Sequence, residues 1–576
     1  MLPKWFEEAR FGMFIHWGLY AALGGLWKGQ EMTYIGEWIQ ARFRIPNEEY
    51  GKLAETFNPV KFDADEWIRT AAAAGVKYIV YTSKHHDGFA MYHSKVSSYN
   101  IYDATPFKRD PLAELAEACR KYGVRLGIYY SQNLDWHEPD GGDPGPEQPP
   151  NGGMMSWGND WDFPDYDKKD FRRYFESKVK PQIRELLTNY GEVSVLWCDC
   201  PLNMKAEFSQ ELRALVKELQ PNCIINQRIG NNCNDYTGLG DNQLPIDRRN
   251  DTREAPVTLN HTWGFKWNDH AWKTPQTIVK TLASLASRNA NLLLNIGPMP
   301  DGSWPDGTKN VFAGIMPWVQ EHGDAIFASK SNPFAVDMPF GCCTVTGNRL
   351  NLFVDQEVPE VELNGILSKA VAATVPFEQD GETLRLKTDG LNDPMLNCVT
   401  VTFDEPPQVR QDLLPQNGIL QIRPRNGEAI HGTAAAGNVN TTVSADGEME
   451  GDVHSAFGRD GSLQFWDNPA DKIVWKIVLP AGSYRILLET RNRSTWDANA
   501  LWYGDRKIAW QLGSAAVQEV ELTRESGTGG AGISCIGDCT FSEEFRGEFM
   551  LRTVESRSAG AANMDVIGLR FVKVAQ

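Results

Sequence analysis

Imidazoles and carboxylates follow several short apolar runs in the N-terminal half of the chain. His16 closes one run, His85 and His86 follow another, and Asp199 closes the run Val-Ser-Val-Leu-Trp-Cys. A carboxylate at the end of an apolar strand is costly unless it is used or paired, although Asp199 could also cap the helix expected after Pro201. Neutral imidazoles can hydrogen-bond sugar hydroxyls, and carboxylates can act as nucleophiles, acids or bases. The pattern predicts a polar pocket lined by these side chains.

A metal cluster is the competing interpretation of the histidines. His85 and His86 are adjacent, so on a strand they would project to opposite sides, and both could reach one metal ion only if the strand had ended. The sequence has no H-x-x-x-H or H-E-x-x-H spacing, which would place two imidazoles on one face of a helix. We therefore expect a site that works without a metal.

A nucleophilic thiol or serine is not favoured either. Cys198 and Cys200 flank Asp199, and successive side chains of a strand point to opposite faces. If Asp199 points into the pocket, both cysteines should point into the layer between strands and helices. The chain also lacks a G-x-S-x-G nucleophile elbow.

Parallel β/α units would bring these side chains together. Asp110-Pro111 and Thr274-Pro275 are N-cap and N1 pairs of helices, and glycines follow several helical stretches. This alternation favours a (β/α)8-type barrel rather than an open doubly wound sheet. Two of the eight barrel strands are then not recognised in the sequence. Active sites of such barrels lie at the carboxyl ends of the strands. The strand candidates are Phe11–His16, Tyr78–Thr82, Arg125–Tyr130, Val193–Cys198, Cys223–Asn226 and Leu292–Ile296.

Cleavage of a glycosidic bond needs a second carboxyl besides Asp199, because one group is the nucleophile or base and the other the acid. The candidates lie between Ile229 and Trp272, a stretch that we interpret as a loop between two barrel strands. Residue types and spacing do not rank these candidates, which are Asp235, Asp241, Asp247, Asp251, Glu254 and Asp269.

Charge and aromatic content narrow the class of ligand. The 576 residues contain 57 Lys and Arg against 75 Asp and Glu, and the net charge of -18 would repel nucleic acid. The 19 tryptophans suit stacking on uncharged rings such as sugars. Apolar stretches fall short of the ~20 residues of a membrane span. We expect neither a nucleic-acid nor a membrane partner. The oligomeric state stays open, as does the compartment: periplasmic or secreted if a signal peptide has been removed, otherwise cytoplasmic.

Five motifs resemble those of glycoside hydrolase family 29, the α-L-fucosidases, in the same order. They are EARFGMFIHWG, KYIVYTSKHHDGFAMYHS, RLGIYYS, VLWCDCP and NLLLNIGPMPDG, and the match extends to about residue 407. The resemblance implies a retaining exo-α-L-fucosidase with a covalent fucosyl-enzyme intermediate and no active-site metal. Its substrate would be a fucosylated oligosaccharide or polysaccharide. Two other functions remain open: an exo-glycosidase for a fucose-like sugar such as an α-L-galactoside, and a catalytically silent glycan-binding protein.

The resemblance also implies roles for individual residues. Asp199 matches the nucleophile and Glu254 the acid/base, with Asp269 as second choice, and burial should raise the pKa of Glu254. The chain departs from many members in having Arg253 where they have Trp. The sugar ligands implied by the family are His16, Glu37, Trp38, His85, His86 and Tyr129. From their chemistry we add Trp17, Trp197 and Trp263 as stacking surfaces and Arg228 as a hydrogen-bond donor to Asp199.

The fold class is therefore α/β plus all-β, with a barrel followed by two β-sandwiches. We expect the catalytic barrel over residues 1–330, a small antiparallel sandwich over 331–407, a linker over 408–436 and a second sandwich over 437–576. The last unit resembles galactose-binding-type carbohydrate-binding modules, which implies glycan binding and a structural calcium ion. A spacer or oligomer contact is the alternative interpretation.

Overall fold

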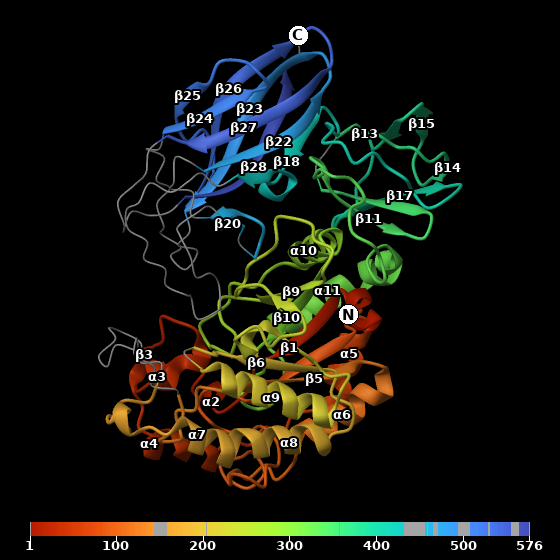
Figure 1. The fold of residues 1–576 in the computed structure, drawn as a ribbon. Coiled ribbons are helices and arrows are strands. Elements are labelled where there is room, and N and C mark those ends of the chain that lie inside the picture. The colour runs from red at the N-terminus through yellow and green to blue at the C-terminus, as the bar shows by residue number, and fades with distance from the viewer. Residues whose placement is uncertain are drawn as a thin grey trace.

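The computed structural model describes residues 2–142, 158–202, 204–355, 358–430, 456–457, 459–464, 471–492, 507–527, 530–554 and 564–574. Figure 1 shows a β/α barrel at one end and two all-β units at the other. The predicted fold class is confirmed. The exact unit boundaries stay predictions, and residues 431–455, around the predicted start of the last unit, lie outside the described residues.

The barrel is built on one parallel sheet of eight strands in the order β7-β6-β5-β4-β1-β10-β9-β8. The two unrecognised strands are β8 (Thr237–Gly238) and β9 (Arg253–Thr258), both inside the stretch interpreted as a loop. β8 has two residues, and β9 contains Pro256 and two charged residues, so neither shows a strand pattern. The expected strands are confirmed, within a few residues, as β1 (Phe11–Ile15), β4 (Tyr78–Lys84), β5 (Arg125–Ser131), β6 (Val195–Asp199), β7 (Ile224–Ile225) and β10 (Ala290–Ile296).

Helices alternate with these strands. α6 (Pro111–Tyr122) begins after Asp110, whose Oδ1 accepts hydrogen bonds from two backbone N–H groups of the first turn, as the sequence predicts. Between β5 and β6 the chain forms α7 (Phe171–Tyr174), a π-helical turn (Phe175–Val179) and α8 (Lys180–Thr188). The remaining helices are α1 (Lys4–Ala9), α2 (Tyr20–Leu23), α3 (Ile39–Phe43), α4 (Asn47–Gly51), α5 (Ala64–Ala73), α9 (Ala206–Leu219), α10 (Pro275–Ser287) and α11 (Asp306–His322), with 3-10 turns that include η1 (Gly36–Trp38) and η5 (Gln227–Ile229). Within the described residues, no helix combines the length and apolar composition that crossing a membrane requires.

Alternate side chains of the strands enter two different cores. In β6, Leu196 and Cys198 pack in the large core that also contains the helices. Val195 and Trp197 point the other way, into an aromatic cluster that includes Phe14 and fills the barrel interior. Because the interior is filled, the space for a ligand lies beyond the strand ends.

The small β unit has two antiparallel sheets. One contains β11 (Gly341–Thr346), β12 (Arg349–Val354), β17 (Asn397–Phe403) and β14 (Ala370–Ala373), and the other contains β13 (Glu360–Asn364), β16 (Thr383–Lys387) and β15 (Phe377–Asp380). The C-terminal unit also has two sheets. One contains β20 (Ala456–Phe457), β21 (Leu463–Gln464), β28 (Met564–Val574), β23 (Gly482–Asn492) and β26 (Ala531–Phe541), and the other β22 (Lys472–Leu479), β27 (Phe545–Thr553), β24 (Lys507–Leu512) and β25 (Gln518–Glu521).

The stretch expected to be a linker contributes two strands to these C-terminal sheets. β18 (Ile419–Ile422) pairs with β28, and β19 (Glu428–Ile430) pairs with β22. Leu420 and Ile422 are fully buried in an apolar core that continues through both β units. The Pro, Gln and Asn content of this stretch is typical of a linker, so the prediction did not recognise the alternation of buried residues that marks its strands.

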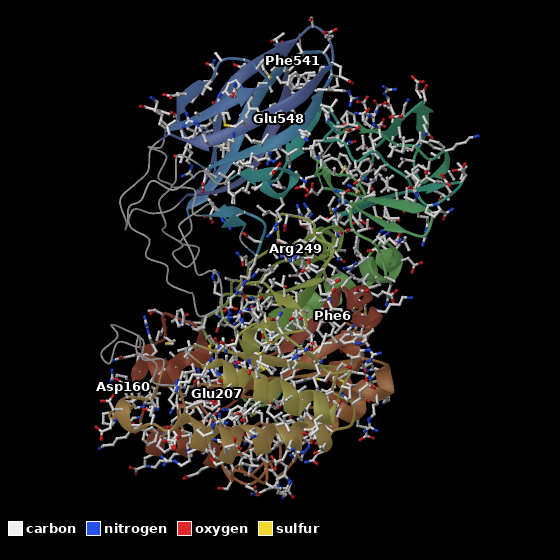
Figure 2. All side chains as sticks on the ribbon, in the orientation of Figure 1. Phe6, Asp160, Glu207, Arg249, Phe541 and Glu548 are labelled. Atoms are coloured by element: carbon white, nitrogen blue, oxygen red, sulfur yellow. The ribbon has the colours of Figure 1, made fainter. Side chains whose placement is uncertain are left out.

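The C-terminal unit contacts the barrel through the segment that precedes β9. The Ile246 N–H donates to the Asp460 carbonyl at 2.7 Å, and Arg253 Nη1 donates to the Arg459 carbonyl at 3.0 Å. Arg253 and Arg425 both pair with Asp247. Figure 2 labels Arg249 of the same segment, between the barrel and the C-terminal sheets. Arg253, at the start of β9, thus joins the barrel to the C-terminal unit.

Candidate active site

A cavity of about 220 Å³ opens beyond the carboxyl ends of the barrel strands. Its volume corresponds to about seven water molecules, which is the scale of one monosaccharide. Most of the predicted site residues line this cavity: His16, Glu37, Trp38, His85, His86, Trp197, Asp199, Arg228 and Trp263. Its other lining residues are Phe14, Tyr34, Ile35, Cys200, Pro201, Leu202, Gly240 and Asp241.

Asp199 ends β6 on the side that faces the barrel interior. Its Oδ1 accepts a hydrogen bond from Arg228 Nη1 at 2.9 Å, and its Oδ2 accepts one from the Tyr129 hydroxyl at 2.9 Å. Burial alone would raise the pKa of Asp199, but the Arg228 guanidinium, His86 and these hydrogen bonds hold it below its usual range. The carboxylate is therefore ionised near neutral pH.

Three buried imidazoles surround the cavity. β4 ends at Lys84, so His85 and His86 leave the strand alternation and both line the cavity, with ring centroids 4.1 Å apart. Burial lowers the pKa of His16 to about 3 and that of His86 to about 4, and it lowers the pKa of His85 well below its usual value. All three rings are neutral near pH 7.

Hydrogen bonds fix the tautomers of His16 and His86. The Asn295 amide nitrogen donates to the Trp263 carbonyl, so its Oδ1, 2.6 Å away, accepts from His16 Nδ1. Ser131 donates its proton to the Leu134 carbonyl and therefore accepts from His86 Nδ1, 2.7 Å away. In both rings Nε2 keeps its lone pair, which can accept a hydrogen bond from a ligand hydroxyl.

Two further carboxyl groups line the cavity. Glu37 is fully buried and accepts a hydrogen bond from the Gly264 N–H at 2.8 Å, and burial raises its pKa to about 7. Asp241 lies between β8 and β9 with 24% of its side chain exposed, and it pairs with Nη2 of Arg228. Arg228 thus bridges Asp199 and Asp241, because its two terminal nitrogens contact one carboxylate each.

Glu254 is not among the cavity lining residues. It lies on β9 and points into the barrel interior, where its carboxylate accepts hydrogen bonds from Tyr78, Trp197 and Tyr236 at 2.7, 2.7 and 3.1 Å. Trp197 lines the cavity and also donates to Glu254. Burial raises the pKa of Glu254 despite the three donors, so the direction expected from sequence is confirmed. This placement does not favour Glu254 as the group that reaches a leaving oxygen.

Three other predicted residues lie outside the cavity lining. Trp17 is fully buried and stacks on Phe62, with centroids 5.4 Å apart, so it does not present a face to the cavity. Asp269 accepts a hydrogen bond from the His261 N–H at 2.9 Å and shapes a loop. Tyr129 lies behind the cavity wall and acts on it through its hydrogen bond to Asp199.

The expected orientation of the two cysteines is confirmed for Cys198 and wrong for Cys200. The strand ends at Asp199, and Cys200 takes a left-handed backbone conformation with φ of 47°. This turn brings the Cys200 side chain into the cavity wall, with Sγ 3.7 Å from His86 Nε2. Strand alternation could not indicate the reversal.

Sequence reasoning included Asp241 among the candidates but did not rank it. Its neighbours Gly240 and Asn242 are typical of any loop, and its position depends on β8 and on the long-range contact with Arg228. Tyr34 and Leu202 also line the cavity but were not predicted, and no pattern in the sequence indicates either of them.

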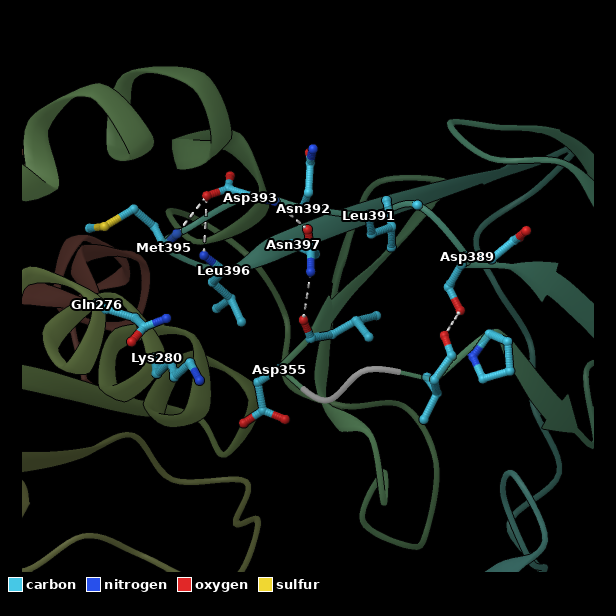
Figure 3. A pocket seen from close by; sticks show the side chains of 15 residues that line it. Gln276, Lys280, Asp355, Asp389, Leu391, Asn392, Asp393, Met395, Leu396 and Asn397 are labelled. Atoms are coloured by element: carbon cyan, nitrogen blue, oxygen red, sulfur yellow. Dashed lines mark hydrogen bonds between the residues drawn. The ribbon is translucent and has the colours of Figure 1, made fainter.

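A larger cleft, of about 700 Å³, lies between α10 and the small β unit (Figure 3). Its walls come from Gln276 and Lys280 on the barrel side and from the β12–β13 and β16–β17 connections on the other. Imidazole, indole and phenol rings are absent from its lining residues. Its ionisable lining residues are Lys280, Asp355, Asp389 and Asp393, so the cleft has carboxyl groups but none of the imidazoles and indoles found at the strand ends.

A parallel β/α barrel whose strand ends surround a monosaccharide-sized cavity with carboxylates, neutral imidazoles and indoles is the architecture of a glycoside hydrolase. A family model described as Alpha-L-fucosidase matches residues 1–324, more than half of the chain. The protein belongs to the alpha-L-fucosidase family.

Named relatives agree with this assignment. The tissue alpha-L-fucosidase of Rattus norvegicus is 29% identical over 354 residues, which cover 57% of this chain and 70% of the relative. The structure is similar to that of the alpha-L-fucosidase from Vibrio sp. strain EJY3, with a TM-score of 0.81 and 26% identity over 99% of this chain and 97% of the other. Alpha-L-fucosidase AlfC from Lactobacillus casei, in complex with alpha-L-fucose product, is 44% identical with a TM-score of 0.52, over 55% of this chain and 99% of its own.

Proposed function

We propose that the protein is a retaining exo-α-L-fucosidase, which hydrolyses terminal α-L-fucosyl residues through a covalent fucosyl-enzyme intermediate. The observation that carries this proposal is the bridge of Asp199 and Asp241 by Arg228 at a cavity that holds one sugar. Retaining enzymes place their two carboxyl groups about 5 to 5.5 Å apart. Arg228 contacts both carboxylates, so Asp199 and Asp241 lie close together at the cavity.

Asp199 is the nucleophile in this proposal. It is the carboxyl with a guanidinium and a phenol as donors, and its lowered pKa keeps it ionised. Attack of a carboxylate oxygen on C1 of the bound sugar forms the ester intermediate and expels the leaving oxygen. Water then attacks C1 from the face that the leaving group vacated, which retains the α configuration.

Asp241 is the acid/base, in place of the predicted Glu254 or Asp269. In an exo-acting enzyme the leaving group extends from the pocket to solvent, so the acid must stand at the opening. Among the cavity carboxyls other than Asp199, Asp241 is 24% exposed on its side chain, whereas Glu37 is fully buried. Glu37 is then placed to accept a hydrogen bond from a sugar hydroxyl.

The neutral rings of the cavity hold the sugar in this proposal. Nε2 of His16 and of His86 each carry a lone pair, and they accept hydrogen bonds from neighbouring hydroxyls. His85 Nδ1 is buried with no hydrogen-bond partner among the described residues, so it can bind a further hydroxyl. Trp263 and Trp38 supply indole surface for the apolar side of the sugar.

Replacement of Asp199 by Ala tests the retaining mechanism. We expect turnover of an aryl α-L-fucoside to be lost and azide to restore it with β-L-fucosyl azide as product, because the small anion attacks C1 from the side that Asp199 occupied. Wild-type turnover in the variant, or the α-azide as product, would refute the assignment.

Side-by-side assay of sugars and linkages tests the substrate class. The Lactobacillus casei enzyme has been solved with 4-nitrophenyl-α-L-fucopyranoside and with Fucα(1,6)GlcNAc, which are therefore first choices here. An aryl α-L-galactoside cleaved faster than the fucoside would favour the alternative exo-glycosidase. Binding of fucose without turnover of any fucoside would favour the silent glycan-binding protein.

Glycan binding and a structural calcium ion in the C-terminal unit stay proposals. The sheets of this unit are described, but residues 465–470, 493–506 and 555–563 lie outside the described residues. Elemental analysis of the purified full chain measures calcium per protein. A glycan array probed with the Asp199→Ala variant, with and without free fucose, separates binding outside the barrel cavity from binding within it.

A further inference from the structure

Three side chains of the kinds that bind zinc converge on one wall of the barrel cavity. His86, Asp199 and Cys200 each offer one ligand atom, and these atoms all lie within 4.8 Å of one another. His86 and Asp199 are buried, and Cys200 is half-buried and lines the cavity. They follow the carboxyl ends of β4 and β6, the two strands that flank β5 in the sheet.

The distances fit a tetrahedral metal. His86 Nε2 lies 3.7 Å from Cys200 Sγ and 3.7 Å from Asp199 Oδ2. In a tetrahedral zinc site, Zn–N, Zn–S and Zn–O bonds of ordinary length place such ligand atoms about 3.4 to 3.6 Å apart. Both distances from His86 lie within a few tenths of an ångström of these values, and the atoms of Cys200 and Asp199 lie within 4.8 Å of each other.

The ligand atoms also have the right electronic state. The hydrogen bond from Nδ1 to Ser131 leaves a lone pair on His86 Nε2, the atom that faces Cys200 and Asp199. Asp199 holds Arg228 through Oδ1, whereas Oδ2 faces His86. The cavity wall carries the carboxyls of Asp199, Glu37 and Asp241 against the single guanidinium of Arg228 among its lining residues, so its charge favours a cation.

We propose that His86, Asp199 and Cys200 form an inhibitory site for one soft divalent cation such as Zn²⁺. Binding exchanges the thiol proton of Cys200 for a bond from Sγ to the metal, and the proton passes to solvent. The fourth coordination position stays open to the cavity for water. The metal occupies the nucleophile and a sugar-binding imidazole, so it excludes substrate.

The functional consequence rests on the proposed function, but metal binding itself does not. Titration of the reduced full chain with Co²⁺ tests the site, because a cobalt–thiolate bond produces a charge-transfer absorption band that does not depend on activity. We expect the band to saturate at one Co²⁺ per chain and to disappear when Zn²⁺ displaces the cobalt.

Two substitutions at one position and a matched control identify the ligand. Cys200→Ser removes the soft donor, and Cys200→Gly does so with a residue that suits the φ of 47°. Cys535→Ser removes another half-buried free cysteine, on β26, far along the chain from the site. We expect the cobalt–thiolate band in the wild-type protein and in Cys535→Ser. We expect both Cys200 variants to lack it. No band in wild type, or a band that persists in both Cys200 variants, would overturn the proposal.

Inhibition gives the second readout. We expect Zn²⁺ to raise the apparent KM of an aryl α-L-fucoside, and its inhibition constant to rise at least tenfold in Cys200→Ser when each variant is compared with its own metal-free rate. Equal inhibition of wild type and both Cys200 variants would overturn the proposal. A chain that shows the cobalt band but cleaves no fucoside would support the metal site and refute the proposed function.

Discussion

Asp199, at the mouth of the barrel, and Glu254, deeper in its interior, are both nearly fully buried, and each accepts three hydrogen bonds. Their pKa values nevertheless move in opposite directions. Asp199 faces the guanidinium of Arg228, whereas Glu254 faces two phenols and an indole, all of them neutral. Hydrogen bonds from neutral donors reduce the cost of burying a carboxylate but do not cancel it; a full positive charge does.

This difference separates two uses of a buried carboxyl group. At the mouth, the ionised carboxylate of Asp199 is in contact with the cavity, where it can react with a bound ligand. The interior uses a carboxyl as the common acceptor for Tyr78, Trp197 and Tyr236, which orients the indole that forms part of the cavity wall. Burial alone therefore does not identify the acid/base.

Replacing Asp241 and Glu254 by their amides should give the largest difference in turnover between two variants. Asp241→Asn is expected to lower turnover of fucosides with poor leaving groups by about 10²- to 10⁴-fold, because general acid catalysis is worth about that much. Fucosides with good leaving groups should be affected far less at the glycosylation step. Glu254→Gln should stay within about tenfold of wild type on both substrates, since its hydroxyl partners can reverse their hydrogen bonds.

Steady-state kinetics on a series of aryl fucosides measures this contrast. If Glu254→Gln instead shows the loss that depends on leaving group, Glu254 is the acid/base and the interior is part of the reaction site.

Removal of the Arg228 guanidinium should abolish the difference between the pKa shifts of Asp199 and Glu254. Arg228→Met is expected to lower kcat/KM by about 10²- to 10³-fold. In the proposed mechanism Asp199 must be ionised to react. Arg228 lowers the pKa of Asp199, so loss of the guanidinium should raise that pKa and move the acid limb of the pH–rate profile to higher pH. Arg228→Lys, which keeps one charge, should move the limb less. An unmoved acid limb in Arg228→Met would show that Arg228 does not set the pKa of Asp199.

Truncation in the interior should appear as lost stability. Glu254→Ala leaves three buried donors without an acceptor and is expected to lower the free energy of unfolding by about 3 kcal/mol, measured by chemical denaturation. Glu254→Gln is the control and should lose less at pH 5. The folded pKa of Glu254 lies above its usual value of 4.5, so its contribution is fully present below that pH and is lost as pH rises through the folded pKa. The free energy of unfolding of Glu254→Gln should therefore increase relative to that of wild type as pH rises. A difference between the two that does not change with pH would contradict the raised pKa of Glu254.

The smallest effect is expected from the contact between the C-terminal unit and the mouth. With the Gln227 amide turned so that both its oxygen and its nitrogen are paired, Oε1 accepts hydrogen bonds from Arg459 Nη2 and Nε at 2.7 and 3.0 Å. Gln227 directly precedes Arg228. Arg459→Ala should lower kcat/KM about three- to tenfold and shift the acid limb slightly upward, through a less well fixed Arg228. Arg546→Ala, on β27 of the same unit, is the control and should leave both unchanged. Identical behaviour of the two variants would show that the contact does not reach the site.

Much of the barrel and the cavity was predictable from the sequence because short-range patterns specify them. Cap residues marked the helices, apolar runs marked six strands, and polar residues at the strand ends marked His16, His85 and Asp199. Side-chain alternation on a regular strand also placed Cys198 correctly.

The remaining errors arise where the chain leaves regular structure or where distant segments meet. Cys200 turns into the cavity because its backbone is left-handed, which alternation does not foresee. Asp241 is placed by Arg228 and by the two-residue strand β8, and Trp17 is drawn away by Phe62, which follows it by 45 positions in the chain. Local pattern carries no information on such contacts.

The shared guanidinium of Arg228 has a consequence for how this site can change over generations. Because one side chain serves two carboxylates, the effects of substitutions at positions 199, 228 and 241 will not be additive. In the proposed mechanism the three side chains act together, so we expect a first change at any of them to reduce the value of the other two. We therefore expect these positions to change together, with a replacement donor to Asp199 in place before Arg228 is lost.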